Sequence, residues 1–174
     1  MRAARYRAGQ FWRYLRPAPL SAADRAEVRQ ALPPALSALF ERLAAGEQAH
    51  SLTVLRAVLR AAPAAPPELR QAALLHDVGK SRAPLTLLDR VLVVAVTTLW
   101  PGRAAAWGQG APIGLRRPFV TAARHPAWGA ELAAQAGAPP LTVALIRRHQ
   151  TPVSAPLTPE DEWLAVLQSA DDDA

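Results

Sequence analysis

Residues 74–80 read Leu-Leu-His-Asp-Val-Gly-Lys, and the fold and the site of this chain follow from this heptad. The apolar residues at its start indicate a helix that is buried in a core, and Gly79 is typical of the left-handed position that ends a helix. The imidazole of His76 beside the carboxylate of Asp77 suits Mn, Fe, Co, Ni or Zn better than Mg or Ca. The heptad therefore predicts a buried helix end that carries metal ligands.

The chain has only four histidines, and each falls in an expected helix or at its edge: His50, His76, His125 and His149. A single histidine at such a place is more often a polar residue at a helix end than a ligand. The four together, with Asp77 after the second and Asp171 near the last residue, predict a metal centre. Asp171 is preferred to Asp172 because it shares a helix face with Leu164 and Leu167.

The ordered set His50, His76-Asp77 and Asp171 resembles the H…HD…D signature of the HD superfamily of metal-dependent phosphohydrolases. Residues 124–132, Arg-His-Pro-Ala-Trp-Gly-Ala-Glu-Leu, are similar to a segment of the HD-GYP branch. The resemblance covers residues 46–172 and implies a compact all-α HD-domain bundle. It also implies hydrolysis of a phosphate ester or anhydride in a phosphorylated small molecule of nucleotide type.

The resemblance further implies roles for individual residues. Lys80 matches a lysine that can hold a phosphate oxygen, and Asp77 can bridge two ions because a carboxylate has two oxygens. One or two transition-metal ions are expected, since only dinuclear relatives use the third and fourth histidines. The implied ligands are His50, His76, Asp77, His125, His149 and Asp171. From the sequence, His125 can equally be a helix cap, and His149 a cation at a helix end.

Several alternatives stay open. The G-Y-P loop of the HD-GYP branch is absent after His149, where Gln150 follows, so hydrolysis of cyclic di-GMP is not expected. A non-catalytic HD-like ligand-binding or signalling module is the alternative reading, and an oxidative di-iron activity also occurs on this scaffold. Glu47 is a weak match to a further ligand of some relatives. Extra phosphate contacts can come from Arg82, Arg147 and Arg148.

Composition limits the class of protein. A length of 174 residues predicts one structural domain, in which helices of residues 1–45 pack on an HD domain of residues 46–174. The absence of cysteine excludes disulfides and thiolate sites and fits a cytoplasmic protein. The net charge of +6 is spread along the chain, so it favours a phosphorylated substrate over a nucleic-acid partner. The longest apolar stretch, residues 91–100, falls short of a spanning helix, so no membrane partner is expected. The oligomeric state cannot be read.

Helical periodicity and proline positions give the elements. The apolar residues 86–100 predict a central core helix, and Leu69, Leu92 and Leu145 are expected to fill the core. Residues 101–117, with glycines and prolines, predict a long irregular loop. The other predicted helices cover residues 3–15, 21–32, 33–46, a segment that begins at or just before residue 50, 67–78, 126–136, 139–150 and 158–172.

Overall fold

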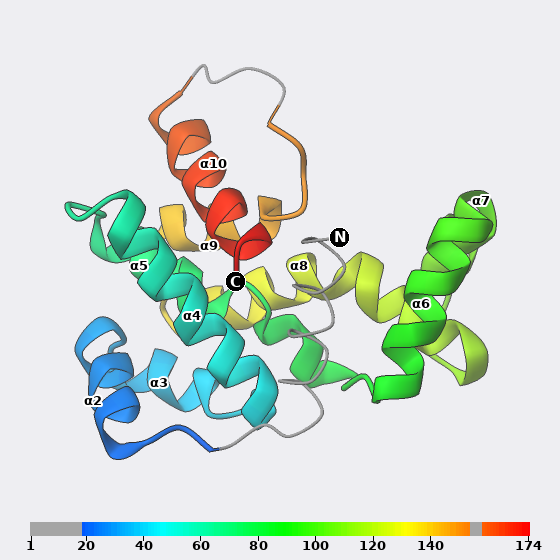
Figure 1. Ribbon diagram of the computed structural model, residues 1–174, viewed down its shortest axis with the longest axis horizontal. Helices are drawn as coiled ribbons and strands as arrows, with labels where there is room; N and C mark the ends of the chain where they lie inside the picture. The colour runs from blue at the N-terminus through cyan, green and yellow to red at the C-terminus, as the bar shows by residue number, and fades with distance from the viewer. Residues whose placement is uncertain (1–18, 154–157) are drawn as a thin grey trace, which may run out of the picture.

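The computed structural model describes residues 19–153 and 158–174, so the predicted helix over residues 3–15 lies outside the described part. Every regular element in these ranges is helical, which confirms the all-α prediction (Figure 1). The α-helices are α2 Ala22–Ala31, α3 Pro34–Phe40, α4 Ala45–Ala61, α5 Pro67–Leu75, α6 Leu87–Leu99, α7 Pro101–Gly108, α8 Arg117–Gln135, α9 Pro140–Arg148 and α10 Pro159–Asp172. Two 3₁₀ helices, η1 Val78–Arg82 and η2 Gly114–Arg116, complete them.

The main body forms around α4, α5, α8, α9 and α10, with α2 and α3 packed at one side (Figure 1). Its core is aliphatic, and Leu55, Leu69, Leu145 and Leu164 are fully buried there. The core roles predicted for Leu69 and Leu145 are therefore confirmed. Helix α5 lies between α4 and α9, so the heptad at its end enters the middle of the bundle.

The helix ends follow local signals in the sequence. Ser21 caps α2 in a reciprocal capping box with Asp24, and Thr158 caps α10 by accepting a hydrogen bond from the backbone N–H of Asp161. Gly137 adopts a φ of 81° just after α8, as expected of a glycine that ends a helix. Helix α4 starts at Ala45, earlier than predicted, and therefore places His50 in its second turn.

The prediction of a core helix over residues 86–100 is wrong in burial, although α6 forms almost at the predicted bounds. Only Val96 of α6 is buried, Leu92 is half-buried, and Leu88 is 79% exposed. The predicted loop over residues 101–117 is also wrong, because α7 and η2 form there. Helices α6 and α7 lie side by side and project from the body as an arm (Figure 1). No helix among the described residues is long and apolar enough to cross a membrane.

Gly79 is required for close packing and not for a left-handed turn, so its predicted conformation is wrong. A Cβ atom at Gly79 would lie 2.0 Å from the carbonyl oxygen of His125 and 2.6 Å from the backbone nitrogen of Gly129. Gly129 faces Gly79 across the same contact, with its own Cβ position 3.2 Å from the Gly79 nitrogen. The backbones of η1 and α8 therefore touch, which fixes Asp77 relative to His125.

Helix α8 runs without interruption through Pro126, where the sequence predicted a helix start. Proline lacks an N–H, so the carbonyl of Ala122 loses its usual partner four residues ahead. The Nδ1 atom of His125 lies 3.0 Å from that carbonyl oxygen and replaces the missing donor. The helix continues because the neighbouring side chain satisfies the one backbone group that the proline leaves unpaired.

We expect Gly79→Ala to lower the free energy of unfolding by about 3 kcal/mol, because the new methyl group meets backbone atoms that cannot rotate away. Gly102→Ala in α7 is the matched control, since nothing lies within 4 Å of its Cβ position. That control is expected to change stability by at most about 1 kcal/mol, in the stabilising direction. Chemical denaturation measures both variants, and equal stability of the two would contradict the close approach of η1 and α8.

Candidate metal centre

The structure brings all six predicted ligands together in two adjoining groups. The first triad consists of His50, His76 and Asp171, and the second triad of Asp77, His125 and His149. Within each triad the candidate ligand atoms lie within 4.8 Å of one another. These side chains come from α4, α8 and α10 and from the residues that end α5 and α9, so five helices converge on the site.

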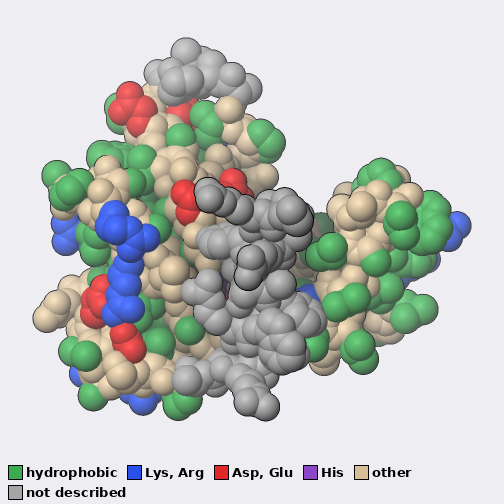
Figure 2. Space-filling view, in the orientation of Figure 1, with side chains coloured by type: hydrophobic (Ala, Val, Ile, Leu, Met, Phe, Trp, Pro, Cys, Tyr) green, Lys and Arg blue, Asp and Glu red, His purple; other side chains and the backbone are tan. Residues whose placement is uncertain are grey.

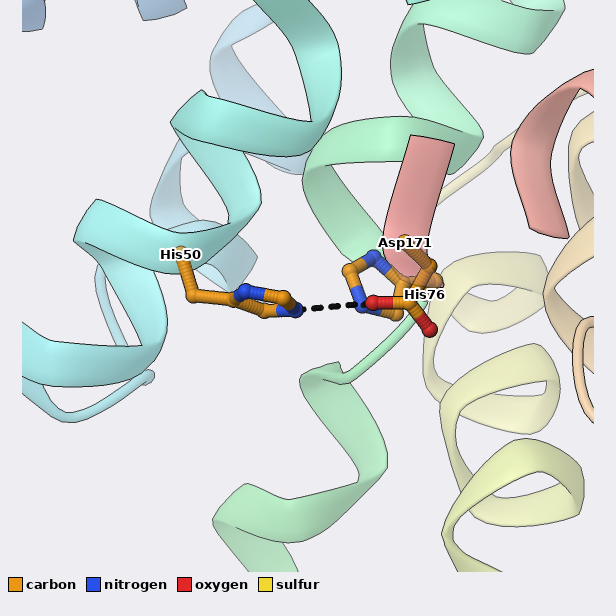
Figure 3. Close-up of side chains that lie close together, drawn as sticks. All are labelled: His50, His76 and Asp171. Atoms are coloured by element: carbon orange, nitrogen blue, oxygen red, sulfur yellow. Dashed lines mark hydrogen bonds and ion pairs between the residues drawn. The ribbon is translucent and has the colours of Figure 1, made fainter. Parts of the chain in front are cut away.

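In the first triad, the ring of His50 reaches from α4 towards Asp171 at the end of α10 (Figure 3). Its Nε2 atom lies 2.8 Å from Oδ1 of Asp171. Nε2 of His76 lies 3.5 Å from the same oxygen and is buried without a hydrogen-bond partner. Three candidate ligand atoms therefore face one point between α4, α5 and α10.

Asp77 lies between the two triads and offers one oxygen to each side. Oδ2 is 3.5 Å from Nε2 of His76, and Oδ1 is 3.2 Å from Nε2 of His125. The Nε2 atom of His149 is 3.9 Å from Oδ1 and 3.3 Å from Nε2 of His125. Asp77 would therefore be placed to contribute a carboxylate oxygen to an ion on either side.

Three of the histidines are held in the same way. Nδ1 of His76 lies 3.0 Å from the carbonyl oxygen of Ala73, and Nδ1 of His149 lies 2.8 Å from that of Ile146. His125 makes the equivalent contact with Ala122. A carbonyl only accepts hydrogen bonds, so each Nδ1 carries the proton and donates. Each Nε2 therefore points into the site, as in metal-binding histidines whose other nitrogen is fixed by a backbone carbonyl.

The charges of the protein groups act strongly on the first triad. Burial lowers the pKa of His76, but the carboxylates of Asp77 and Asp171 outweigh burial and raise it to about 10. For Asp171, burial favours the neutral acid, yet the hydrogen bond with His50 and the contact with His76 hold its pKa well below the usual range. Burial also opposes ionisation of Asp77, but Lys80 and His76 lower its pKa. The site thus combines the buried carboxylate of Asp77 with the half-buried carboxylate of Asp171, and both attract positive charge.

His149 is neutral and does not act as a cation at the end of α9. Burial is the main cause that lowers its pKa, to about 3, and the charge of His76 adds to the shift. A neutral imidazole whose Nδ1 donates to Ile146 has a lone pair on Nε2, and this lone pair faces His125 and Asp77. The sequence allowed His149 to be either a metal ligand or a cation at a helix end, and the structure favours the first, because its Nε2 atom faces the site.

These residues fit a transition-metal ion. Two ligands that are each about 2.1 Å from one ion lie about 3.0–3.5 Å apart, and the separations given above for the nearest ligand atoms span 2.8–3.9 Å. The buried Nε2 of His76 lacks a hydrogen-bond partner, which is costly unless another group binds it. Imidazole nitrogens and carboxylate oxygens together suit Zn, Fe, Mn, Co or Ni. Each triad can therefore hold an ion.

Lys80 connects the centre to a second buried carboxylate. Its Nζ atom donates to Oδ2 of Asp77 at 2.5 Å and lies 3.8 Å from Oε2 of Glu47. Glu47 is buried and also accepts a hydrogen bond from Arg90 of α6. A pocket of about 170 Å³ opens beside these side chains, with Arg42 at its wall. The sequence analysis noted Glu47 only as a weak match to a further ligand and did not identify Arg90. The pairing of the two could not be predicted because it joins residues 43 positions apart.

Two of the arginines that could supply extra phosphate contacts, Arg82 and Arg148, form ion pairs with carboxylates of the protein. Arg82 pairs with Glu131, and Arg148 pairs with Glu160 and Asp161 at the start of α10. Arg147 is exposed.

Two polar contacts at opposite ends of α10 dock it on the end of α9. The pairs of Arg148 hold the first turn, and Gln168, which the sequence analysis missed, donates to the carbonyl oxygen of His149 at 3.0 Å. Gln168 lies one turn before Asp171 on α10. Asp171 is therefore held in place although it is close to the last residue of the chain.

Comparison with known protein families gives a match to the family described as HD domain, over residues 48–171. No curated protein and no solved structure matched the chain. The match concerns the HD domain as a whole and gives no support for the HD-GYP branch. It spans α4 to α10 and contains both triads. A match over most of the sequence, with the His and Asp residues gathered at its centre, shows that this chain belongs to the HD domain family.

Proposed function

We propose that the protein is a metal-dependent phosphohydrolase that cleaves a phosphate ester or anhydride of a nucleotide-type substrate. The observation that carries the proposal is the position of Asp77, with one oxygen directed to each of two histidine-containing triads. Such a pair of triads matches the site of a hydrolase that uses two ions to hold a phosphoryl group. Membership of the HD domain family supports the same reaction class.

We assign His50, His76 and Asp171 to one ion, and Asp77, His125 and His149 to the other, with Asp77 shared. When bound, the ions supply Lewis acidity, which polarises the phosphoryl oxygens and lowers the pKa of water. The protein contributes fixed directions for the ligands through the three Nδ1 hydrogen bonds. Manganese, iron, cobalt, nickel and zinc all fit these nitrogen and oxygen ligands. The number of ions per chain, one or two, is to be determined by experiment.

We give Lys80 the role of a cation at the rim of the centre. It holds Asp77 in one orientation, and its side chain is 20% exposed, so it lies where a ligand can approach. A fixed ammonium group there offsets the negative charge that builds up on a phosphoryl group as the bond breaks. Arg42 at the wall of the adjoining pocket adds a second positive charge near the same path.

The proposed substrate is a phosphorylated small molecule such as a nucleotide. The pocket of about 170 Å³ is smaller than the sites that enclose a drug-sized ligand, so it fits one part of such a molecule. Hydrolysis of cyclic dinucleotides is not proposed, since the G-Y-P loop is absent after His149.

The test combines metal analysis with a substrate panel. Protein reconstituted with each of the five metals is analysed for ions per chain and then assayed on nucleotides, cyclic nucleotides and dinucleoside polyphosphates. Turnover that depends on the metal supports the proposal. Stoichiometric metal without turnover of any substrate would favour the non-catalytic ligand-binding module, and substoichiometric metal under all conditions would exclude both triads as metal sites.

His76→Ala and Asp77→Ala are expected to abolish turnover and to leave a cooperatively folded helical protein, because both side chains serve the site and not the aliphatic core. Gln71→Ala is the matched control: Gln71 is buried on the same helix, but it contacts Thr142. The control is expected to keep full metal content and activity. Retained turnover in both histidine and aspartate variants would place the catalytic site elsewhere.

His149→Ala separates one ion from two. We expect metal content to fall from about two ions per chain towards one, with activity reduced about 10- to 100-fold or more. Thr142→Ala is the matched control, since it removes a buried polar group of α9 far along the helix from the site. If both variants lose stability and neither loses metal, His149 is not a metal ligand, and the centre holds a single ion.

Metal uptake should release a proton from His76. Its pKa of about 10 means that the imidazole is protonated at pH 7 among the protein groups alone, and a ligand must be deprotonated to bind an ion. The affinity of the first triad should therefore rise with pH up to about 10, by up to about tenfold per unit, and level off above that pH. Calorimetry in buffers of different ionisation enthalpy measures the released protons. Uptake without proton release, in wild type and in His149→Ala, would contradict the raised pKa.

A further inference from the structure

The arm formed by residues 87–116 carries an unusual surface. All large hydrophobic side chains that are exposed among residues 19–153 and 158–174 lie on it. They include Leu88, Val94, Ile113 and Leu115, each at least 66% exposed. Helix α6 alone is about 20 Å long at 1.5 Å per residue. A contiguous apolar surface of this kind usually marks an interaction site.

Apart from Asp89, the charged side chains of the arm and of the segment that follows it to residue 130 are all arginines. Residues 91–130 contain four arginines and no aspartate or glutamate, although the whole chain has 14 acidic residues. Arg117 is neutralised by Asp89. The other three, Arg103, Arg116 and Arg124, are exposed and make no ion pair with any acid in the described ranges. Figure 2 shows hydrophobic side chains over the arm, and no acidic side chain on the part of the arm that is visible there.

We propose that this arm binds the surface of an anionic lipid bilayer, with the apolar side chains of α6 entering the interface and the arginines contacting lipid phosphates. Interfacial helices combine an apolar face with basic residues and need no spanning segment. The sequence predicted no membrane partner because no stretch can span a bilayer; binding at the surface does not need one. The proposal is independent of the function proposed for the metal centre.

Charge complementarity favours a bilayer over the other occupants. A two-fold contact between two copies would bring identical surfaces together, and the only carboxylate of the arm, Asp89, is already paired with Arg117. The exposed arginines of two copies would then meet with no free carboxylate to offset them. A nucleic acid would match the arginines but would leave Leu88, Val94 and Leu99 without an apolar partner. An anionic bilayer satisfies both features, since its lipid phosphates attract arginine and its acyl region accepts leucine and valine.

The experiment is co-sedimentation of the full chain with vesicles of phosphatidylcholine alone or of phosphatidylcholine containing phosphatidylglycerol. We expect binding to the anionic vesicles only, and weaker binding at high salt. Val94→Gln with Leu99→Gln should lower partitioning about tenfold or more, because both side chains are exposed in the free protein and become buried in the interface. These substitutions remove no core contact, and circular dichroism checks that the fold is retained.

The charge contribution needs a matched control. Arg103→Gln with Arg116→Gln should lower partitioning by about tenfold or more. Arg29→Gln with Arg60→Gln removes the same charge from exposed positions outside the arm and should change it by less than about threefold. No binding to anionic vesicles, or an equal loss in the two arginine pairs, would overturn the proposal. The proposal would also be overturned if the wild-type protein were a dimer that Val94→Gln with Leu99→Gln dissociates. Binding of RNA, but not of vesicles, that persists in the variant with both substitutions would overturn it too.

Discussion

Three histidines of the centre each donate a hydrogen bond from Nδ1 to a backbone carbonyl that lacks a helical N–H partner, and the site depends on this interaction. His76 and His149 follow the last residues of α5 and α9, where the final carbonyls have no intrahelical donor. His125 lies within α8, but Pro126 creates the same need there. One contact thus stabilises a helix end and directs Nε2 to the site.

The second constraint is the backbone contact between Gly79 and α8. Asp77 is buried and carries charge, which is tolerable only if its partners are close on every side. A separation of η1 from α8 by the width of one methyl group would move Asp77 away from His125, to which it is linked at 3.2 Å. The small residues at positions 79 and 129 therefore set the distance between Asp77 and His125 within the second triad.

The sequence predicted the parts of this structure that local chemistry determines. The helix starts at residues 21 and 158, the helix end at residue 136 and the candidate ligand set were predicted from residue types and spacing, and each lies within one residue of a helix boundary or at the site. It missed contacts that depend on distant segments: the meeting of Gly79 with α8, and the bond from Gln168 to His149. It also placed α6 in the core, since apolar periodicity shows which face avoids water and not which partner covers it.

A row of alternating charges links that exposed helix to the metal centre. Arg90 of α6 pairs with the buried carboxylate of Glu47, which approaches Lys80, which in turn binds Asp77. Each of these charges is offset by its neighbours, so removal of one weakens the compensation of the charges beside it. The root of the arm is thereby fixed to the centre by Arg90, while Val91, Val94 and Leu99 farther along α6 are exposed. The same helix therefore supports the electrostatics of Asp77 at one end and leaves apolar side chains exposed along the rest of its length.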